Sequence, residues 1–364
     1  MVKRILHIVG GMDRAGAETM IMNLYRNVDR EKIQFDFLYF KSKKCDYDEE
    51  IIALGGKIHR LIFKNPLDQY KKLIHFYKKH TEYKIVHSHT LLNSAITLSA
   101  AKKVGIPYRI AHSHNTSNGK NGLFKKIYEK WAIKKISKVG NVFFSCGKEA
   151  SNYLFPNKES KFILNGIDVD EYHRISQENR NYLEKLFEIK NQIKLIQIGR
   201  LDAVKNHQFS LQLAELLMID NYDFKLFIVG QGPSKKYIEK IIKQKKLSNH
   251  VVLLGVRNDV PQLMAGADLM LMPSLHEGFP VVLVESQAIG LPALISTEIS
   301  KEVDLNLNLV YFCSLDDNLE VWQENIHSIV ENGKNNTDSF QLLKQKGFDA
   351  VTNALELENF YLNL

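Results

Sequence analysis

Short apolar runs alternate with segments of helical spacing along most of the chain, and this alternation begins twice. The first series contains KRILHIVGG, IQFDFLYF, KIVHSHT, PYRIAHSHN and VGNVFFSCG, and the second contains IKLIQIGR, FKLFIVGQG, HVVLLG, DLMLMPS and PALIS. Strands that alternate with helices indicate βαβ units and a parallel sheet. A chain of 364 residues also exceeds what one hydrophobic core usually fills. We therefore predict an α/β protein with two doubly wound parallel-sheet domains that face a central cleft.

The second series begins after LNGIDVDEYH, which places the joint between the domains near residues 165–172. We expect a first domain over 1–165 and a second over 166–340. The final segment, 341–364, has helical spacing and is expected to pack back on the first domain. The DVD sequence at 168–170 is similar to a metal-binding Asp-x-Asp motif, but its place in the linker predicts a turn.

Charge is distributed unevenly between the two halves. Residues 1–165 carry 30 Lys+Arg and 14 Asp+Glu (+16), and residues 166–364 carry 19 and 27 (−8), which sum to the net +8 of the chain. A basic first half predicts an anionic partner, such as nucleic acid phosphate or a membrane face. No apolar stretch reaches 18 residues, the N-terminus does not have the pattern of a signal peptide, and three scattered cysteines suggest neither disulfides nor zinc. These features predict a cytoplasmic protein without membrane spans.

The stretch EGFPVVLVESQAIGLPAL carries two acids eight positions apart in an otherwise apolar run. Pro280 suits the first turn of a helix over about 280–289, which Gly290 would end. At helical rise Glu277 and Glu285 would lie about 12 Å apart, wider than the roughly 5–9.5 Å between paired glycosidase carboxylates. They could instead hold the two ends of one long, hydroxyl-rich ligand whose anionic middle lies against the helix start. The alternative for Glu285 is a solvated side chain in mid-helix.

Two glycine-containing loops upstream suit a diphosphate. GRLDAVKN follows a strand and contains Gly199, Arg200 and Lys205, and VGQGP follows the next strand and contains Gly230 and Gly232. Glycine lets the backbone approach a ligand, while an Arg fork and a Lys point charge in one loop could neutralise a diphosphate. The alternative is a surface loop whose basic side chains are merely solvated.

The ordered set GRLDAVKN, VGQGP and GADLMLMPSLHEGFPVVLVESQAIGLP resembles the retaining glycosyltransferases of family 4, which have the two-Rossmann GT-B architecture. The resemblance covers essentially the whole chain and is most specific over about 195–295. It implies that Arg200 and Lys205 grip the diphosphate of a nucleotide-sugar donor. It also implies that Glu277 faces the transferred sugar and that Glu285 binds the nucleotide ribose. The same resemblance implies backbone contacts to the donor from Gly278, Phe279 and Pro280.

Two H-S-H motifs lie at expected strand ends. In the family one histidine at the place of PYRIAHSHN reaches the donor sugar and phosphate, and either His112 or His114 could match it. We favour His114 because the polar Asn115 and a loop follow it. His87 and His89 are weaker candidates, and a purely structural role is the alternative for all four. No carboxylate or cysteine accompanies them at ligand spacing, so no metal site is expected.

The N-terminal segment GGMDRAGAE departs from the family pattern, in which a second glycine pair precedes the Glu; Ala15 stands in the first of those places. Gly11 and Gly16 still permit a tight loop, and we predict that both line the ligand site. Because of the departure, the acceptor-side contacts, including any role for Glu18, stay open.

Helix 120–138, KNGLFKKIYEKWAIKKISK, sets apolar residues such as Ile127 and Trp131 against seven lysines. Basic flanks with an aromatic and aliphatic face favour a helix that lies in the plane of a membrane surface. The alternative is a core helix with a solvated basic side. The charge of the first domain favours the membrane, and we expect peripheral association with the anionic inner face of the plasma membrane.

The resemblance implies a glycosyltransferase that moves a hexose or N-acetylhexosamine from a nucleotide sugar to a lipid-linked or glycan acceptor, and a UDP-sugar is the expected donor. Cell-surface polysaccharide assembly, such as exopolysaccharide or capsule, is the expected setting. We expect no prosthetic group, no nucleic acid partner and no metal requirement, because Arg200, Lys205 and a helix start can stabilise the leaving diphosphate.

Three alternatives stay open at this point. A sugar-nucleotide 2-epimerase shares the architecture and needs no acceptor, and a non-catalytic glycan-binding subunit would show no donor hydrolysis. A dinucleotide oxidoreductase is disfavoured because GGMDRAGAE lacks the spacing of G-x-G-x-x-G, and FKSKK after the second strand lacks the ribose-binding acid.

Overall fold

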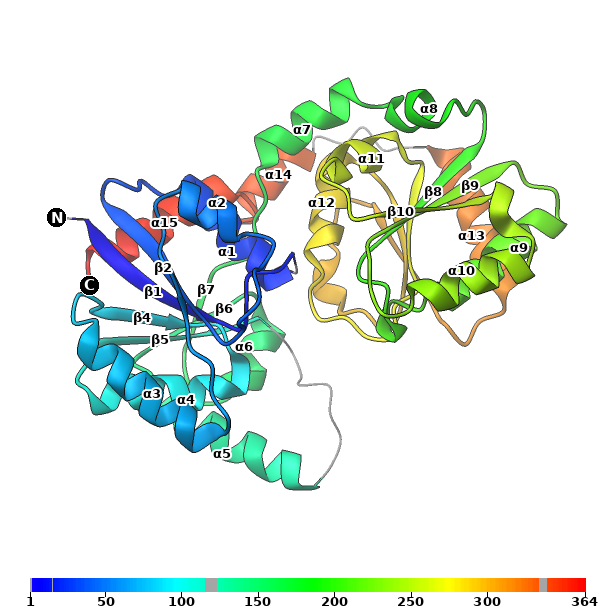
Figure 1. Cartoon of the computed structure of the whole chain (residues 1–364). Helices are drawn as coiled ribbons and strands as arrows, with labels where there is room; N and C mark the ends of the chain where they lie inside the picture. The colour runs from blue at the N-terminus through cyan, green and yellow to red at the C-terminus, as the bar shows by residue number, and fades with distance from the viewer. Residues whose placement is uncertain (1, 15, 115–122, 334–338) are drawn as a thin grey trace. The chain divides into compact units, whose positions relative to one another are not determined.

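The computed structural model describes residues 2–14, 16–114, 123–333 and 339–364. It divides into two compact units, which we call unit 1 (Met1–Ile167 with Gly347–Leu364) and unit 2 (Asp168–Lys346). The sheet of unit 1 has the order β3-β2-β1-β4-β5-β6-β7, and that of unit 2 the order β10-β9-β8-β11-β12-β13 (Figure 1). Neighbouring strands pair in parallel throughout. Both units are therefore Rossmann-like, as predicted.

The elements of unit 1 are β1 (Lys3–Val9), α1 (Gly16–Asn27), β2 (Ile33–Tyr39), α2 (Asp48–Ala53), β3 (Ile58–Arg60), α3 (Pro66–Lys79), β4 (Ile85–Ser88), α4 (Ser94–Lys103), β5 (Tyr108–Ser113), α5 (Leu123–Val139), β6 (Val142–Ser145), α6 (Lys148–Leu154), β7 (Lys161–Phe162) and α15 (Ala350–Leu362). The elements of unit 2 are α7 (Val169–Glu178), α8 (Tyr182–Phe187), β8 (Ile193–Ile198), α9 (His207–Ile219), β9 (Phe224–Val229), α10 (Lys235–Gln244), β10 (Val251–Gly255), α11 (Val260–Gly266), β11 (Leu269–Met272), α12 (Val281–Ile289), β12 (Ala293–Ser296), β13 (Val310–Cys313), α13 (Leu319–Asn332) and α14 (Ser339–Gln345). Single 3-10 turns are η1 (Leu91–Asn93), η2 (Ala203–Lys205), η3 (Leu247–Asn249) and η4 (Lys301–Val303).

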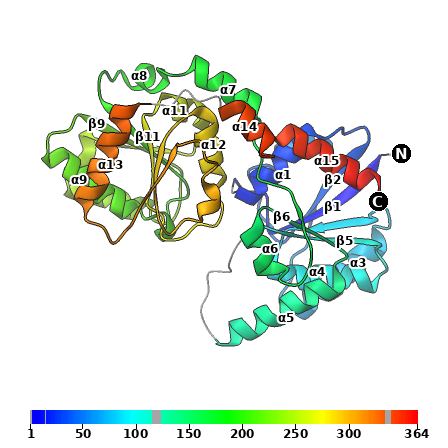
Figure 2. The same cartoon turned by 180° about the vertical axis from the view of Figure 1, so that it is seen from behind.

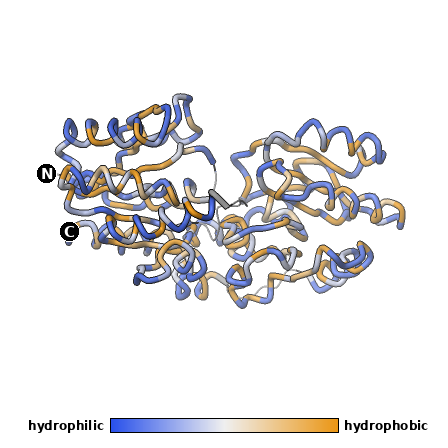
Figure 3. The backbone as a smooth tube through the Cα atoms, turned by 90° about the horizontal axis from the view of Figure 1, so that it is seen from below, coloured by the Kyte–Doolittle hydropathy of each residue, from blue (hydrophilic) through white to orange (hydrophobic). Residues whose placement is uncertain are grey.

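Each sheet is covered by helices on both faces, which is why its strands are apolar on both sides. In unit 1, α1 and α15 pack on the face that carries Ile5, Phe35 and Phe37, and α3, α4 and α5 pack on the other (Figures 1 and 2). In unit 2, α9, α10 and α13 cover one face, and α7, α8, α11 and α12 cover the other. Hydrophobic and hydrophilic residues alternate along most helices (Figure 3), as expected for elements with one buried side.

Alternating side chains of each strand point to opposite faces of its sheet. His7, His87 and His112 have the same parity as Ile5, Ile85 and Ile110, so they lie on the face covered by α1 and α15. The register pairs His7 with His87 across β1 and β4. This parity brings the histidines of three separate strands to one place at the carboxyl ends of the sheet.

The structure corrects several sequence expectations. KIVHSHT forms the fourth strand rather than the third, because the short β3 precedes it, and β7 and β13 were also missed. These strands have only two to four residues, which is too short for a clear apolar pattern. The DVD sequence is not a turn: Asp168 is the N-cap of α7 and accepts a hydrogen bond from the Glu171 amide at 3.0 Å. The chain passes from unit 1 to unit 2 between Ile167 and Asp168, and it returns to unit 1 between Lys346 and Gly347.

Candidate active site

The two glycine loops of unit 2 lie against each other backbone to backbone. Gly199 follows β8 with φ +151°, and Gly230 follows β9 with φ +138°, both in the region that favours glycine. A Cβ atom on Gly230 would lie 2.0 Å from the Gly199 carbonyl oxygen, and one on Gly232 would lie 2.3 Å from that of Leu201. The amide of Leu201 donates to the Gln231 carbonyl at 3.1 Å. Glycine is therefore required at these positions to hold the first loop in place.

Lys205 is fixed at both its backbone and its side chain. It ends the turn η2, where the Asp202 carboxylate accepts from the Lys205 amide at 3.3 Å and Gln197 Nε2 donates to the Lys205 carbonyl at 2.9 Å. Its alkyl chain runs beside Gly199, where an added Cβ would lie 2.9 Å from Cε. Its ammonium Nζ lies 2.7 Å from Oε1 of Glu277, and the two side chains are only 17% and 19% exposed. The structure thus brings together two of the residues predicted for the site.

Arg200 occupies the same loop but is far more exposed. Its side chain is 72% exposed, and Nε lies 3.8 Å from Oδ2 of Asp202. At that separation the ion pair holds the guanidinium weakly, so most of its five donors face solvent. Arg200 and Lys205 together supply two cations on one loop, which is the arrangement that was predicted for an anionic ligand.

The loop before α12 positions Glu277. The Glu277 carbonyl accepts from the Ser300 amide at 3.3 Å, and Glu277 forms an isolated parallel bridge with Ile299. Pro280 lies one residue earlier than predicted: it is the N-cap of α12 rather than its first residue, and no side chain caps the helix start. Gly290 ends α12, as predicted, and the structure shows it in the left-handed conformation. Phe279 packs on the core of unit 2 beside α12.

Glu285 is half-buried in α12, so it is not the solvated side chain of the alternative interpretation. Burial raises its pKa, and a hydrogen bond with Tyr172 of α7 opposes that rise. Tyr172 was not identified from the sequence, because α7 was taken for linker. The carboxyl group is therefore held in place within unit 2 and not left to move freely in solvent.

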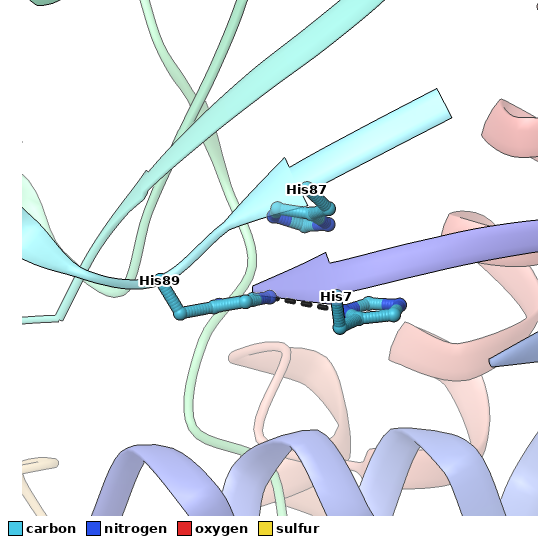
Figure 4. Close-up of side chains that lie close together, drawn as sticks. All are labelled: His7, His87 and His89. Carbon is cyan, nitrogen blue, oxygen red and sulfur yellow. Dashed lines mark hydrogen bonds between the residues drawn. The ribbon is translucent and has the colours of Figure 1, made fainter. Parts of the chain in front are cut away.

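Five histidines gather at the carboxyl ends of β1, β4 and β5 in unit 1. His7 and His89 share a hydrogen bond, dashed in Figure 4, with 3.0 Å between His7 Nδ1 and His89 Nε2. His89 Nδ1 lies 2.8 Å from His114 Nε2. A second chain joins His87 Nε2 to His112 Nδ1 at 3.2 Å. Burial is the largest of the causes that lower the pKa of all five imidazoles. The pKa of His7 and that of His114 fall to about 3. All five are therefore neutral near pH 7.

Two triads within this cluster offer one nitrogen per residue within 4.8 Å of one another: His7, His87 and His89, and His89, His112 and His114. An imidazole lone pair lies in the plane of its ring, so rings that share one ion must point at a common atom. Here the hydrogen-bonded rings of His7 and His89 are only 15° from parallel, and His87 stacks on His89 with centroids 4.2 Å apart (Figure 4). The nitrogens of His7 and His89 face each other, and the ring of His87 lies over that of His89. The three rings would therefore have to rotate before their lone pairs could meet at one ion.

The remaining predicted residues lie near the end of β1. A Cβ on Gly11 would lie 2.8 Å from Lys41 Cδ, so the loop passes closely over that side chain, which is ion-paired with Asp13 at 2.5 Å. Gly16 begins α1, and burial raises the pKa of Glu18 in its first turn. Ala15, Asn115 and Lys120 lie outside the described residues.

Two site neighbours escaped the sequence analysis besides Tyr172. His7 lies on β1, and its alternation along that strand, which matches that of the H-S-H motifs on β4 and β5, could have revealed it. Tyr361 of α15 touches His87, with its hydroxyl 2.5 Å from Nδ1. No local pattern marks it, because it lies 274 positions away in the sequence.

Comparison with known proteins identifies the family. The model described as Glycosyl transferases group 1 matches residues 178–339, and the model described as Glycosyltransferase Family 4 matches residues 14–171. A protein of Bacillus subtilis that carries the name glycosyltransferase EpsF is 36% identical over 99% of this chain and 96% of its own length. The chain belongs to glycosyltransferase family 4. CapH of Staphylococcus aureus, named as a capsular polysaccharide biosynthesis glycosyltransferase, is 25% identical over 99% of both chains.

Other relatives of this family 4 glycosyltransferase are more distant. The UDP-Gal:alpha-D-GlcNAc-diphosphoundecaprenol alpha-1,3-galactosyltransferase of Escherichia coli is 26% identical over 78% of this chain and 80% of its own. Among solved structures, Anabaena HepE in complex with UDP-glucose superposes with a TM-score of 0.77 at 18% identity and covers 99% of this chain and all of HepE. The fold class is that of GT-B glycosyltransferases, as predicted.

Proposed function

We propose that this glycosyltransferase moves a hexose or N-acetylhexosamine from a UDP-sugar to a lipid-linked or glycan acceptor during cell-surface polysaccharide synthesis, with retention of the anomeric configuration. The observation that carries the proposal is the Lys205–Glu277 pair, held between the glycine loops and the start of α12. The complexes of HepE with UDP and UDP-glucose support a uridine donor. The name of CapH supports the setting, and the name of the diphosphoundecaprenol galactosyltransferase supports the acceptor class.

Within this proposal each residue has a distinct task. Arg200 and Lys205 neutralise the diphosphate as positive charge develops on the sugar ring. Glu277 orients the hydroxyls of the transferred sugar, and the ion pair with Lys205 holds its carboxylate in place. Glu285 accepts hydrogen bonds from the ribose. His112 or His114 contacts the sugar or the adjacent phosphate, and backbone at Gly11, Gly16, Gly199, Gly230, Gly232, Gly278, Phe279 and Pro280 lines the donor.

The reaction needs no separate general base in this proposal. The bond between the anomeric carbon and the phosphate oxygen breaks, the acceptor oxygen bonds to the same face, and the departing phosphate oxygen takes the acceptor's proton. Two cations and the positive end of α12 stabilise the charge of the leaving group, so no divalent ion is required. The near-parallel histidine rings of unit 1 also argue against a resident ion.

Incubation of the purified chain with a panel of UDP-sugars and a lipid-diphosphate-sugar acceptor tests this function. We expect UDP release and a glycosylated acceptor with one UDP-sugar, at a rate that excess EDTA does not change. UDP at 100 times its dissociation constant should stabilise the fold by about 2.7 kcal/mol. Isomerisation of the donor without acceptor would indicate a 2-epimerase instead, and loss of activity in EDTA would refute the metal-independent mechanism.

We further propose that unit 1 docks on an anionic membrane surface at the inner face of the plasma membrane through α5. Ala132, Ile136 and Val139 of α5 pack into the core of unit 1, as a core helix should. The same helix exposes Ile127, Tyr128 and Trp131, with the two aromatic rings 5.6 Å apart. Exposed lysines on α5 include Lys125, Lys126, Lys130, Lys134 and Lys138. Within the described residues no helix is both long enough and apolar enough to cross a bilayer.

Tryptophan fluorescence tests the membrane proposal with the native chain. Trp131 is 48% exposed, whereas Trp322 in unit 2 is buried, so a blue shift on adding vesicles reports α5. We expect the shift with phosphatidylglycerol vesicles and not with neutral phosphatidylcholine. Replacing Lys125, Lys126 and Lys130 by Gln should weaken binding by about 3 kcal/mol, from about 1 kcal/mol per lysine.

The matched control replaces Lys235, Lys236 and Lys240, three exposed lysines of α10 in unit 2, by Gln. This variant loses the same charge and should bind vesicles like the native chain. Equal loss of binding in both triple variants would show that net charge, and not the α5 surface, governs the interaction.

A further inference from the structure

Tyr361, His87 and His112 form a hydrogen-bonded chain that crosses the core of unit 1. The Tyr361 hydroxyl lies 2.5 Å from His87 Nδ1, and His87 Nε2 lies 3.2 Å from His112 Nδ1. All three side chains are at most 1% exposed. His112 Nε2, at the end of the chain, is buried and has no partner among the described residues. A buried nitrogen of this kind costs free energy unless a ligand satisfies it.

Counting protons along this chain fixes their positions. If the Tyr361 hydroxyl accepted from His87, its own proton would be left unpaired in the core, at a cost of about 1–3 kcal/mol. The hydroxyl therefore donates to His87 Nδ1. A neutral imidazole has one N–H, so His87 carries its proton on Nε2 and donates it to Nδ1 of His112. His112 in turn must carry its proton on Nε2.

The neighbouring chain of His7, His89 and His114 has no such anchor. Its two terminal nitrogens, His7 Nε2 and His114 Nδ1, are both buried and without a partner among the described residues. Either terminal nitrogen can carry the third proton, because both directions of donation satisfy the two internal hydrogen bonds equally. The structure thus contains one chain of fixed direction and one of reversible direction. Only the fixed chain presents a defined N–H at its end.

We propose that Tyr361 and His87 are positioning residues that fix His112 as an Nε2–H tautomer, so that this N–H donates to an oxygen of the bound donor substrate. The identity of the ligand rests on the function proposed above, whereas the tautomer does not. The receiving oxygen is a phosphate oxygen or a sugar hydroxyl. A neutral N–H donor contributes a hydrogen bond without competing for the acceptor's proton, which the departing phosphate takes. The proton count therefore favours His112 over His114 for this contact.

The tautomer can be measured on the full chain with ¹⁵N-labelled histidine, because long-range ¹H–¹⁵N correlation separates Nε2–H from Nδ1–H imidazoles. His112→Gln assigns the signal. We expect His87 and His112 as Nε2–H tautomers in the native protein, and averaged nitrogen shifts for both in Tyr361→Phe. Tyr77→Phe is the matched control: it removes a buried hydroxyl of the same unit that donates to the Thr97 carbonyl on the other face of the sheet. It should leave both signals unchanged.

Adding ligand tests the second half of the proposal. A shift of the His112 Nε2 signal with UDP alone assigns the contact to a phosphate oxygen, and a shift only with UDP-sugar assigns it to a sugar hydroxyl. We also expect His112→Gln, which keeps an N–H donor near the Nε2 position, to retain more kcat/KM than His112→Ala.

Three results would overturn parts of the account separately. An Nδ1–H tautomer at His112 in the native protein refutes the positioning role. If His112 is an Nε2–H tautomer but its nitrogen signal does not shift when a UDP-sugar binds, the contact is refuted and the proposed function is unaffected. Failure of every nucleotide sugar to bind refutes the proposed function, together with the ligand half of this inference, while the tautomer stands.

Discussion

Replacing Lys205 by Ala is expected to lower kcat/KM about 10²–10³-fold, the usual cost of removing one preorganised group that stabilises developing charge. The ammonium belongs to the more buried of the two cationic side chains on its loop, because Lys205 packs beside Gly199 and pairs with Glu277. The free energy of unfolding should fall by about 1–3 kcal/mol, because the largely buried Glu277 carboxylate loses its partner. Steady-state kinetics and urea unfolding of the same preparation give both numbers.

Lys194→Ala is the matched control for this result. Lys194 lies on β8 of the same unit, is 10% exposed, and pairs with Glu184 at 3.2 Å and Asp268 at 3.1 Å. Its loss should destabilise unit 2 by about 1–3 kcal/mol while the folded enzyme keeps its kcat. If Lys205→Ala lost stability and activity in the same proportion as Lys194→Ala, Lys205 would be a structural residue and the diphosphate assignment would be wrong.

Unit 1 is expected to unfold in mild acid, well before carboxylates titrate. The pKa of each of the five clustered imidazoles is lowered by burial, so in the folded state they resist protonation. The unfolded chain binds those protons below its pKa of about 6.5. Stability is therefore complete above pH 6.5 and is lost as the pH falls from there toward the folded pKa, which is about 3 for His7.

The slope is about 1.4 kcal/mol per pH unit for each imidazole that stays neutral, so five could remove up to about 7 kcal/mol per pH unit. Domains of this size have about 5–15 kcal/mol of stability in total. We expect loss of far-UV circular dichroism between about pH 6 and 4.5. Unit 2 should outlast unit 1, because fewer of its histidines are buried; His207, with its pKa lowered to about 4 by burial, is one.

Fluorescence of the buried Trp322 reports unit 2 during the same acid titration. We expect it to stay native while the circular dichroism of unit 1 is lost. His114→Gln should reduce the proton uptake by about one and shift the transition to lower pH. A single transition of both units below pH 4 would show that carboxylates, and not the histidine cluster, control acid stability.

The fold class could be read from the sequence because its strands are long apolar runs that repeat twice. β2, IQFDFLY, is buried at every position. A strand that is buried on both sides indicates a sheet with helices on both faces. β3, β7 and β13 were missed in the sequence analysis, because strands of two to four residues are too short to show a hydrophobic periodicity. The start of α7 was taken for a turn because Asp168 and Asp170 were compared with a metal motif instead of with an N-cap.

The candidate site was predicted where its residues lie in local motifs and missed where it depends on distant packing. Arg200, Lys205, Glu277 and Glu285 were selected from two short segments, and their roles stay predictions. That Lys205 reaches Glu277 follows from β8 and β11 being neighbours in the sheet, which no local pattern reveals. Tyr361 reaches His87 for a similar reason, since α15 returns to unit 1 at the end of the chain.

A crystal structure with an intact UDP-sugar tests the central claim most directly. The account predicts diphosphate oxygens within about 3 Å of Lys205 Nζ and the Arg200 guanidinium, a normal hydrogen-bond distance. Sugar hydroxyls should then contact Glu277, and the ribose hydroxyls should contact Glu285. A UDP-sugar bound away from these residues, or one that leaves both carboxylates without a ligand contact, would contradict the account.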